Sequence, residues 1–202
     1  MKMNLTENLL WWAAWRPRPL LVLGIVLGLG VAIASSSPFP FLLFVLLSVG
    51  FWICGTQLVN RNATMLLEEA EAQCRVSGAN KLGIKASDGE TFVLRGQTDF
   101  GRFPLISVAP NHTIAVLYAT PSFLGIYAGT VVDLKERHTK FGSTTKELYY
   151  PHIAAVEYSA YEFRLVTTSG ERIPYSTADN PEVGDAALNA VRQHLRKIHA
   201  AV

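Results

Sequence analysis

Two apolar segments near the N-terminus constrain this chain more than any other feature. Leu20–Ala34 and Phe39–Val59 contain no charged residue, and only Ser35–Pro38 separates them. A helix needs about 20 apolar residues, at 1.5 Å each, to cross roughly 30 Å of hydrocarbon. The second segment meets this length alone, and the first meets it when the span starts near Pro17. The sequence therefore predicts a two-span helical hairpin with both chain ends on one side of a membrane.

Basic residues on either side of the hairpin predict its orientation. The flanking basic residues are Lys2, Arg16, Arg18, Arg61 and Arg75, whereas the connecting turn has none. Because positive charge collects on the cytoplasmic side, we expect both termini in the cytoplasm, at a bacterial inner membrane. A cleaved signal peptide is the weaker interpretation of the first segment, since a second span follows immediately.

Residues 4–15 predict a short amphipathic helix at the membrane surface. Asn4 or Thr6 is suited to cap this helix. Tryptophan prefers the headgroup level, and arginine meets anionic lipid. The expected membrane-interface residues are Trp11, Trp12, Trp15, Arg16 and Arg18. A partner-binding peptide is the alternative.

Small residues recur along the first span at a spacing of four. They are Gly24, Gly28, Gly30, Ala32 and Ala34. Such residues let a second helix approach closely. Packing within the hairpin and packing against a partner's helix both remain open. Neither span contains an acid or a base, which argues against a proton or ion path through the hairpin.

The rest of the chain changes from helix to short strands. Residues 63–76 predict a helix that Ser77–Asn80 breaks. Alternating short apolar segments then predict strands, with turns at Ser87–Gly89 and Thr168–Gly170. The expected strands are 81–86, 91–95, 105–108, 113–118, 126–134, 146–149, 154–159, 163–167 and 172–175.

A final amphipathic helix follows these strands. Asp179 or Asn180 is expected to cap it, and Pro181 suits its first turn. Apolar residues recur at helical spacing and predict a face that packs onto the strands: Val183, Ala187, Val191, Leu195 and Ile198.

The second half of the chain carries a familiar pattern. It combines a glycine-flanked strand at 125–132, the segment 147–158 around Tyr149-Tyr150-Pro151, a glycine hairpin at 163–175 and the closing helix. This pattern resembles bacterial pleckstrin-homology-like (PH-like) domains. The resemblance implies a small β-barrel or sandwich that serves as an interaction module. A two-span hairpin before a small barrel also resembles membrane effectors of nucleotide-triggered antiphage systems, in which the barrel binds a cyclic nucleotide.

The predicted fold class is a membrane α-helical hairpin plus a small mainly-β, PH-like domain with a C-terminal capping helix. The expected divisions are an interfacial lead at 1–16, the hairpin at 17–60, a linker helix at 61–78 and a cytoplasmic domain at 79–202.

Composition and motifs argue against several kinds of chemistry. The net charge is +2, and residues 61–202 hold equal numbers of basic and acidic residues. Sequence-independent nucleic-acid binding needs an excess of positive charge, so no nucleic-acid partner is expected. Nucleophile, phosphate-loop and metal-ligand motifs are absent from the sequence. We therefore expect no catalytic residue, metal or cofactor, and the chain is not predicted to be an enzyme.

Two groups of residues are candidate surface contacts. A basic cluster between two predicted strands suits an anion or a lipid headgroup, although a solvated hairpin is the plainer interpretation: Lys135, Arg137, Lys140 and Lys146. Tyr149 and Tyr150 are consecutive in a strand, so one should face the core and the other solvent. The exposed tyrosine is a candidate partner contact.

These patterns favour a non-enzymatic, membrane-anchored subunit or adaptor of a larger membrane protein assembly. Its partners would be membrane lipids and other membrane subunits, or further copies of itself. The alternative is a ligand-gated, nucleotide-sensing homo-oligomeric effector or a self-protection protein, whose small-molecule ligand is unknown.

Overall fold

A computed structural model of the chain describes residues 4–85, 87–98, 105–159 and 161–199. The chain forms two compact units. The helical unit comprises Met1–Leu66 with Gly101–Ala109, and the β-sheet unit comprises Leu67–Phe100 with Pro110–Val202. The second unit therefore takes in part of the segment 61–78 that was expected to be a linker.

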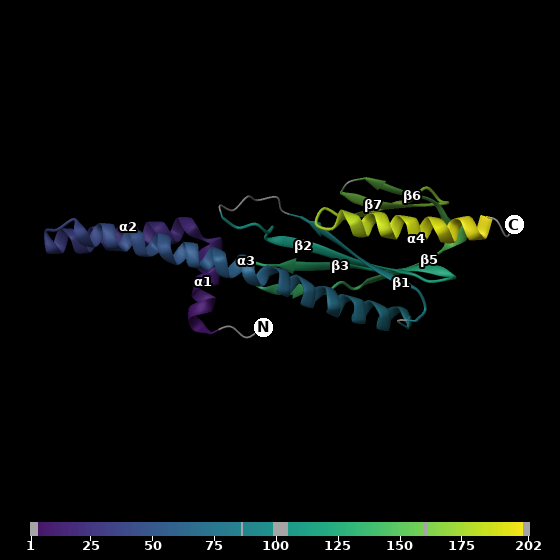
Figure 1. Cartoon of the computed structure of the whole chain (residues 1–202), viewed down its shortest axis with the longest axis horizontal. Coiled ribbons are helices and arrows are strands. Elements are labelled where there is room, and N and C mark those ends of the chain that lie inside the picture. Colours follow the sequence, from purple (N-terminus) through teal and green to yellow (C-terminus); the bar gives the residue numbers. More distant parts are fainter. Residues whose placement is uncertain (1–3, 86, 99–104, 160, 200–202) are drawn as a thin grey trace. The chain divides into compact units, whose positions relative to one another are not determined.

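The helical unit consists of α1 (Leu5–Trp15), α2 (Pro17–Ser35) and the first part of α3 (Phe39–Leu82) (Figure 1). Asn4 accepts from the Glu7 N–H while the Glu7 side chain accepts from the Asn4 N–H, so a capping box starts α1 as predicted. Both α2 and α3 are long and apolar enough to cross a membrane.

The predicted helix break at Ser77–Asn80 is wrong, because α3 continues to Leu82. Gly78 lies where α3 packs on the sheet. A Cβ at Gly78 would be 2.5 Å from the Tyr118 hydroxyl and 2.8 Å from the Tyr127 Cβ. The Tyr118 hydroxyl also donates to the Arg75 carbonyl at 2.6 Å. Tertiary packing thus overrides a local sequence that is typical of a turn.

The larger sheet is an antiparallel meander of β1 (Glu90–Gln97), β2 (Asn111–Ala119) and β3 (Phe123–Asp133). Two short strands, β4 (His138–Lys140) and β5 (Thr144–Tyr149), both pair with β3. They act as one interrupted fourth strand.

The smaller sheet follows a short 3₁₀ turn, η1 (Tyr150–His152). It is a second antiparallel meander of β6 (Ile153–Ser159), β7 (Glu162–Thr167) and β8 (Arg172–Ser176). The last helix, α4 (Pro181–His199), contacts β1 and β6, one strand from each sheet (Figure 1). The predicted glycine hairpin between β7 and β8 is confirmed, with Gly170 at φ +84°.

The core of the β-sheet unit lies between the two sheets and α4. Its buried side chains include Leu117, Ile126, Phe163, Leu165 and Val191, from four different elements. Strand β2 is buried on both faces because alternate residues face this core and α3.

Two predicted strands are wrong. Lys81 and Leu82 end α3, and the described residues up to Lys85 form no strand, while Ala86 lies outside the described residues. Because α3 precedes it, the turn at Ser87–Gly89 comes between a helix and β1 rather than between two strands. Leu105–Val108 is irregular. The strand β4 had no counterpart in the prediction.

Candidate functional site

A buried polar network centred on Asp179 joins four elements of the β-sheet unit. Asp179 Oδ2 lies 2.5 Å from His112 Nδ1 on β2, and the Gln97 amide of β1 donates to Asp179 Oδ1. Arg95 Nε lies 3.6 Å from Asp179 Oδ2, and Arg95 Nη1 lies 2.9 Å from Glu71 Oε1 on α3. Strands β1 and β2, α3 and the residues before α4 therefore share one set of polar contacts.

Asp179 is held as an anion by this network. Burial alone would raise the pKa of Asp179, but hydrogen bonds from His112 and Gln97 and the charge of Arg95 together lower it. The His112 side chain is only 3% exposed. A histidine sealed from solvent cannot meet a substrate, so the geometry fits structural cross-linking rather than acid–base catalysis.

Asn180 lies at the predicted cap position directly before α4, where its carbonyl accepts from the Val183 N–H at 3.1 Å, but its side chain binds β1. Asn180 Oδ1 accepts from the Arg95 N–H at 2.9 Å, and Asn180 Nδ2 donates to the Val93 carbonyl at 2.7 Å. Asp179 also donates its backbone N–H to the Arg95 carbonyl at 3.1 Å. The side chain of Asn180 and the backbone N–H of Asp179 therefore bind backbone groups of β1. Polar residues within otherwise apolar strands, Arg95 and His112, were the available sequence signal for this network.

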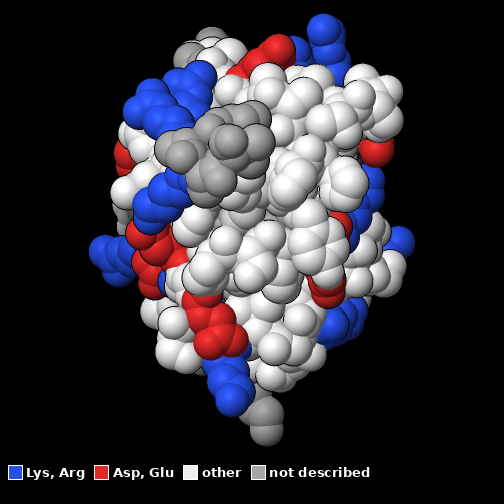
Figure 2. All heavy atoms as spheres, turned by 90° about the vertical axis from the view of Figure 1, so that its right-hand side faces the viewer, with Lys and Arg blue, Asp and Glu red and all other residues white. Residues whose placement is uncertain are grey.

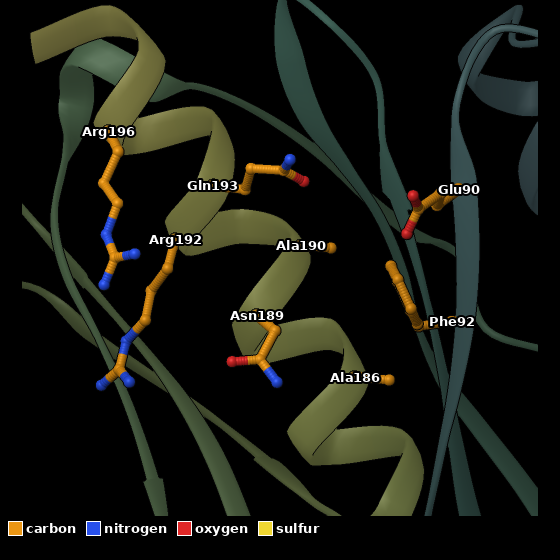
Figure 3. Close-up of a pocket in the computed structure, with 8 residues that line it drawn as sticks. All are labelled: Glu90, Phe92, Ala186, Asn189, Ala190, Arg192, Gln193 and Arg196. Carbon is orange, nitrogen blue, oxygen red and sulfur yellow. The ribbon is translucent and has the colours of Figure 1, made fainter. Parts of the chain in front are cut away.

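A pocket of about 430 Å³ lies between α4 and β1 (Figure 3). Phe92 and two alanines of α4 supply its apolar surface, and Gln193 and Glu90 point toward each other across it. The remaining lining residues are Asn189, Arg192 and Arg196, with Ala186 and Ala190 as the two alanines. This lining offers hydrogen-bonding groups without a nucleophile beside a base.

The two arginines of this pocket lie on the far side of α4 from β1 (Figure 3). Arg192 Nη2 lies 3.4 Å from the Val156 carbonyl of β6. Between α4 and β1, the polar groups of the pocket are therefore the Gln193 amide and the Glu90 carboxylate, while Arg192 binds β6.

His194 connects α4 to η1 by stacking on Tyr150, with ring centroids 5.0 Å apart. Partial burial and the nearby Lys197 lower the pKa of His194, and Glu90 opposes them. Since the folded-state pKa lies below the unfolded value, the unfolded chain binds more protons as the pH falls through about 6.5.

We expect the chain to lose stability between about pH 7 and 5. Thermal unfolding measured across this pH range should show a smaller fall in unfolding temperature for His194→Gln than for the unchanged chain. An equal fall in both proteins would contradict this account.

The predicted basic cluster is divided in the structure. Lys135 and Arg137 lie in the turn between β3 and β4, where the Asp133 carboxylate accepts from the Lys135 N–H at 2.8 Å. Lys140 follows on β4, opposite Val131. Lys146 lies on β5 opposite Ile126, five residues or about 17 Å farther along β3, and pairs with Glu171. The first three residues share one hairpin, and Lys146 is apart from them.

One tyrosine of the pair is buried and the other exposed, as predicted, although Tyr150 begins η1 and does not continue the strand. Tyr150 is 1% exposed and donates its hydroxyl to the Thr120 carbonyl, so it belongs to the core. Tyr149 is 50% exposed and lies beside Phe123, with ring centroids 5.9 Å apart. Only Tyr149 of the two remains a candidate partner contact.

The tryptophans of α1 differ from one another in exposure. Trp11 and Trp15 are buried, whereas Trp12 is 40% exposed with the Arg16 guanidinium 5.6 Å from its ring centroid. Arg18 lies in the first turn of α2. Of the three tryptophans expected at a membrane interface, Trp11 and Trp15 are therefore covered within the chain and Trp12 is the exposed one.

The small residues of α2 separate into two groups. Gly24 and Gly28 are buried against α3, where a Cβ at Gly24 would collide with the Ser48 side chain. Gly30 has no atom within 4 Å of its Cβ position, and Ala34 is exposed, while Ala32 is half-buried. Packing within the hairpin thus uses the first two glycines and leaves Gly30 and Ala34 uncovered.

Charged side chains on the end of the β-sheet unit seen in Figure 2 lie mainly toward its rim, with both signs interspersed. Uncharged residues cover the middle of this face. The visible part of this one face therefore carries no continuous basic surface of the kind that nucleic acids require. Within the described part of the chain, no group of three or more His, Cys, Asp or Glu side chains is placed to hold a metal ion.

The chain was compared with protein families, curated proteins and solved structures. No protein family and no curated protein matches the chain. Among solved structures, it is similar to the MyTH4-FERM MF2 domain of Dictyostelium discoideum myosin VII, mutant 1, at 14% identity and a TM-score of 0.30. The match covers 95% of this chain and 34% of that one, so the chain spans about a third of the length of that structure.

Proposed function

We propose that the chain is a non-enzymatic, membrane-anchored subunit or adaptor, with a helical hairpin in the membrane and a PH-like domain that binds a partner. The observation that carries the proposal is the exposure of the two apolar helices. Only 11% of the apolar window in α2 and 17% of that in α3 is buried within the chain. A core helix of a water-soluble protein would be mostly buried, so lipid or a partner helix is the expected surrounding.

The strand order supports a PH-like assignment for the β-sheet unit. A four-strand meander, with β4 and β5 together as its last strand, precedes a three-strand meander, and a C-terminal helix contacts both sheets. This arrangement matches the resemblance noted in the sequence. Exposed Tyr149 and the uncharged face in Figure 2 are the surfaces of this unit that suit a protein partner.

Packing against a partner helix should depend on the uncovered small residues of α2. We expect Gly30→Leu with Ala34→Leu to weaken retention of co-purifying membrane proteins about tenfold, equivalent to roughly 1.4 kcal/mol. The measurement is the mass and composition of the complex isolated from native membranes in mild detergent.

The matched control is Val22→Leu, an exposed position of the same helix that changes no small residue. An intact complex in the double variant would contradict docking through this face. Loss of the partner in the control as well would indicate a general effect of added bulk.

The ligand-gated effector is a second candidate because the α4–β1 pocket has the volume of a small-molecule site. The same purification separates the two proposals. A stoichiometric set of other membrane proteins supports the adaptor. A homo-oligomer alone supports the effector, and binding of cyclic nucleotides to the full chain would then be measured.

A further inference from the structure

The connection between β1 and β2 contributes a segment to the helical unit. Its described part, Leu105–Ala109, belongs to the same compact unit as α1, α2 and the first part of α3. A connection between two neighbouring antiparallel strands has no need to do so, because two to five residues are enough to join them.

Asn60 on α3 holds this segment with its whole side-chain amide. Asn60 Nδ2 donates to the Leu105 carbonyl at 2.9 Å. Asn60 Oδ1 accepts from the Ser107 N–H at 3.0 Å and from the Ser107 hydroxyl at 3.2 Å. Three hydrogen bonds from one side chain fix the turn from Leu105 to Ser107, which we call the Leu105 turn.

The Leu105 turn presents an apolar side chain outward in a strained conformation. Leu105 has φ +64°, in the left-handed region that leucine rarely adopts. Its side chain is nevertheless 60% exposed. Neither local preference nor burial within the chain favours this arrangement, and such strain persists where the surroundings or a function require it.

The position of Asn60 along α3 indicates what surrounds the turn. Asn60 directly follows Val59, the last residue of the second apolar segment. Helix α1 crosses α3 at Gly55, where a Cβ would be 3.2 Å from the Ala14 nitrogen. The two attachment points are five residues apart on α3, or about 7.5 Å of helix rise. Both therefore lie at the end of the apolar part of α3.

We infer that the Leu105 turn is a second membrane-interface contact, in which Leu105 inserts between lipid headgroups and acyl chains at the depth of α1. This inference rests on the proposed membrane anchoring of α2 and α3. The occupant is a lipid surface because the turn is continuous with the apolar part of α3, and apolar side chains beside a span bind this boundary. The hydrogen bonds from Asn60 keep the Leu105 side chain oriented toward lipid.

The test places a fluorescent probe at single cysteines in the full chain. In a Cys54→Ala background, Leu105→Cys carries an environment-sensitive nitrobenzoxadiazole group, and Cys74 is fully buried. The chain is reconstituted in vesicles of phosphatidylcholine and phosphatidylglycerol with nitroxide-labelled lipids. Leu46→Cys on α3 is the membrane reference, and Tyr161→Cys in the β-sheet unit is the aqueous reference.

We expect the Leu105 probe to show blue-shifted emission and to be quenched by nitroxide lipids, like the Leu46 probe and unlike the Tyr161 probe. Asn60→Ala should remove most of the quenching at Leu105 and leave that at Leu46 unchanged.

A quenched Leu46 probe with an unquenched Leu105 probe would overturn the inference while membrane anchoring stands. A blue-shifted Leu105 probe that lipid quenchers do not reach would indicate a protein contact and also overturn it. Absence of quenching at Leu46 would overturn the anchoring and the inference together.

Discussion

We expect the Asp179→Ala substitution to lower the free energy of unfolding of the β-sheet unit by about 3–5 kcal/mol, the cost of removing one partner of a buried pair. Asp179 accepts from His112 and Gln97 and lies near Arg95, so its loss leaves buried polar groups without their acceptor. Urea unfolding of the full chain in detergent, followed by amide hydrogen exchange in β1 and β2, measures this change.

The matched control for this substitution is Asp185→Ala. Asp185 is an exposed aspartate on α4, and surface changes of this kind cost within about 0.5 kcal/mol. Equal effects of the two variants would show that the network contributes nothing beyond general charge removal.

The Asp179 network should also make the stability of the β-sheet unit depend on pH in the acid range. The folded-state pKa of Asp179 is lowered, so its contribution is present above the unfolded value of about 3.9 and is lost as the pH falls through the folded value. Asp179→Asn should be less stable at neutral pH and lose less stability below about pH 4. An unchanged acid profile would contradict this assignment.

We expect Gly78→Ala to destabilise the β-sheet unit by about 1–3 kcal/mol, the usual cost of overpacking. Helix propensity predicts the opposite sign, since alanine in a helix is favoured over glycine by about 1 kcal/mol. We expect the contacts to determine the sign of the stability change, because the added Cβ would be 2.8 Å from the Tyr127 Cβ and 2.5 Å from the Tyr118 hydroxyl. Urea unfolding monitored by hydrogen exchange in β2 and β3 separates the two expectations.

Gln73→Ala, at an exposed position of α3 in the same unit, is the control for this second substitution. It should change stability little. Stabilisation by Gly78→Ala would show that α3 does not pack closely on the sheet at this point.

Local signals in the sequence were sufficient for most elements. The capping residue Asn4 and the uncharged lengths of α2 and α3 predicted the helices near the N-terminus. Alternating apolar residues predicted β1, β2, β3 and the smaller sheet, because a half-buried strand has a period of two. The sequence also predicted that one of Tyr149 and Tyr150 is buried and the other exposed, but only the structure shows that Tyr150 is the buried one.

Contacts between residues distant in sequence determined the features that local signals did not predict. The turn-like residues around Gly78 stay helical because two tyrosine rings of the sheet require a glycine beside them. The side chains of Asp179 and Asn180 bind β1 and β2, because these strands present polar groups that burial requires to be paired. Asn60 holds a turn more than forty residues away. Sequence periodicity therefore determined which segments form helices and strands, and tertiary packing determined which polar groups meet, because those partners come from different elements.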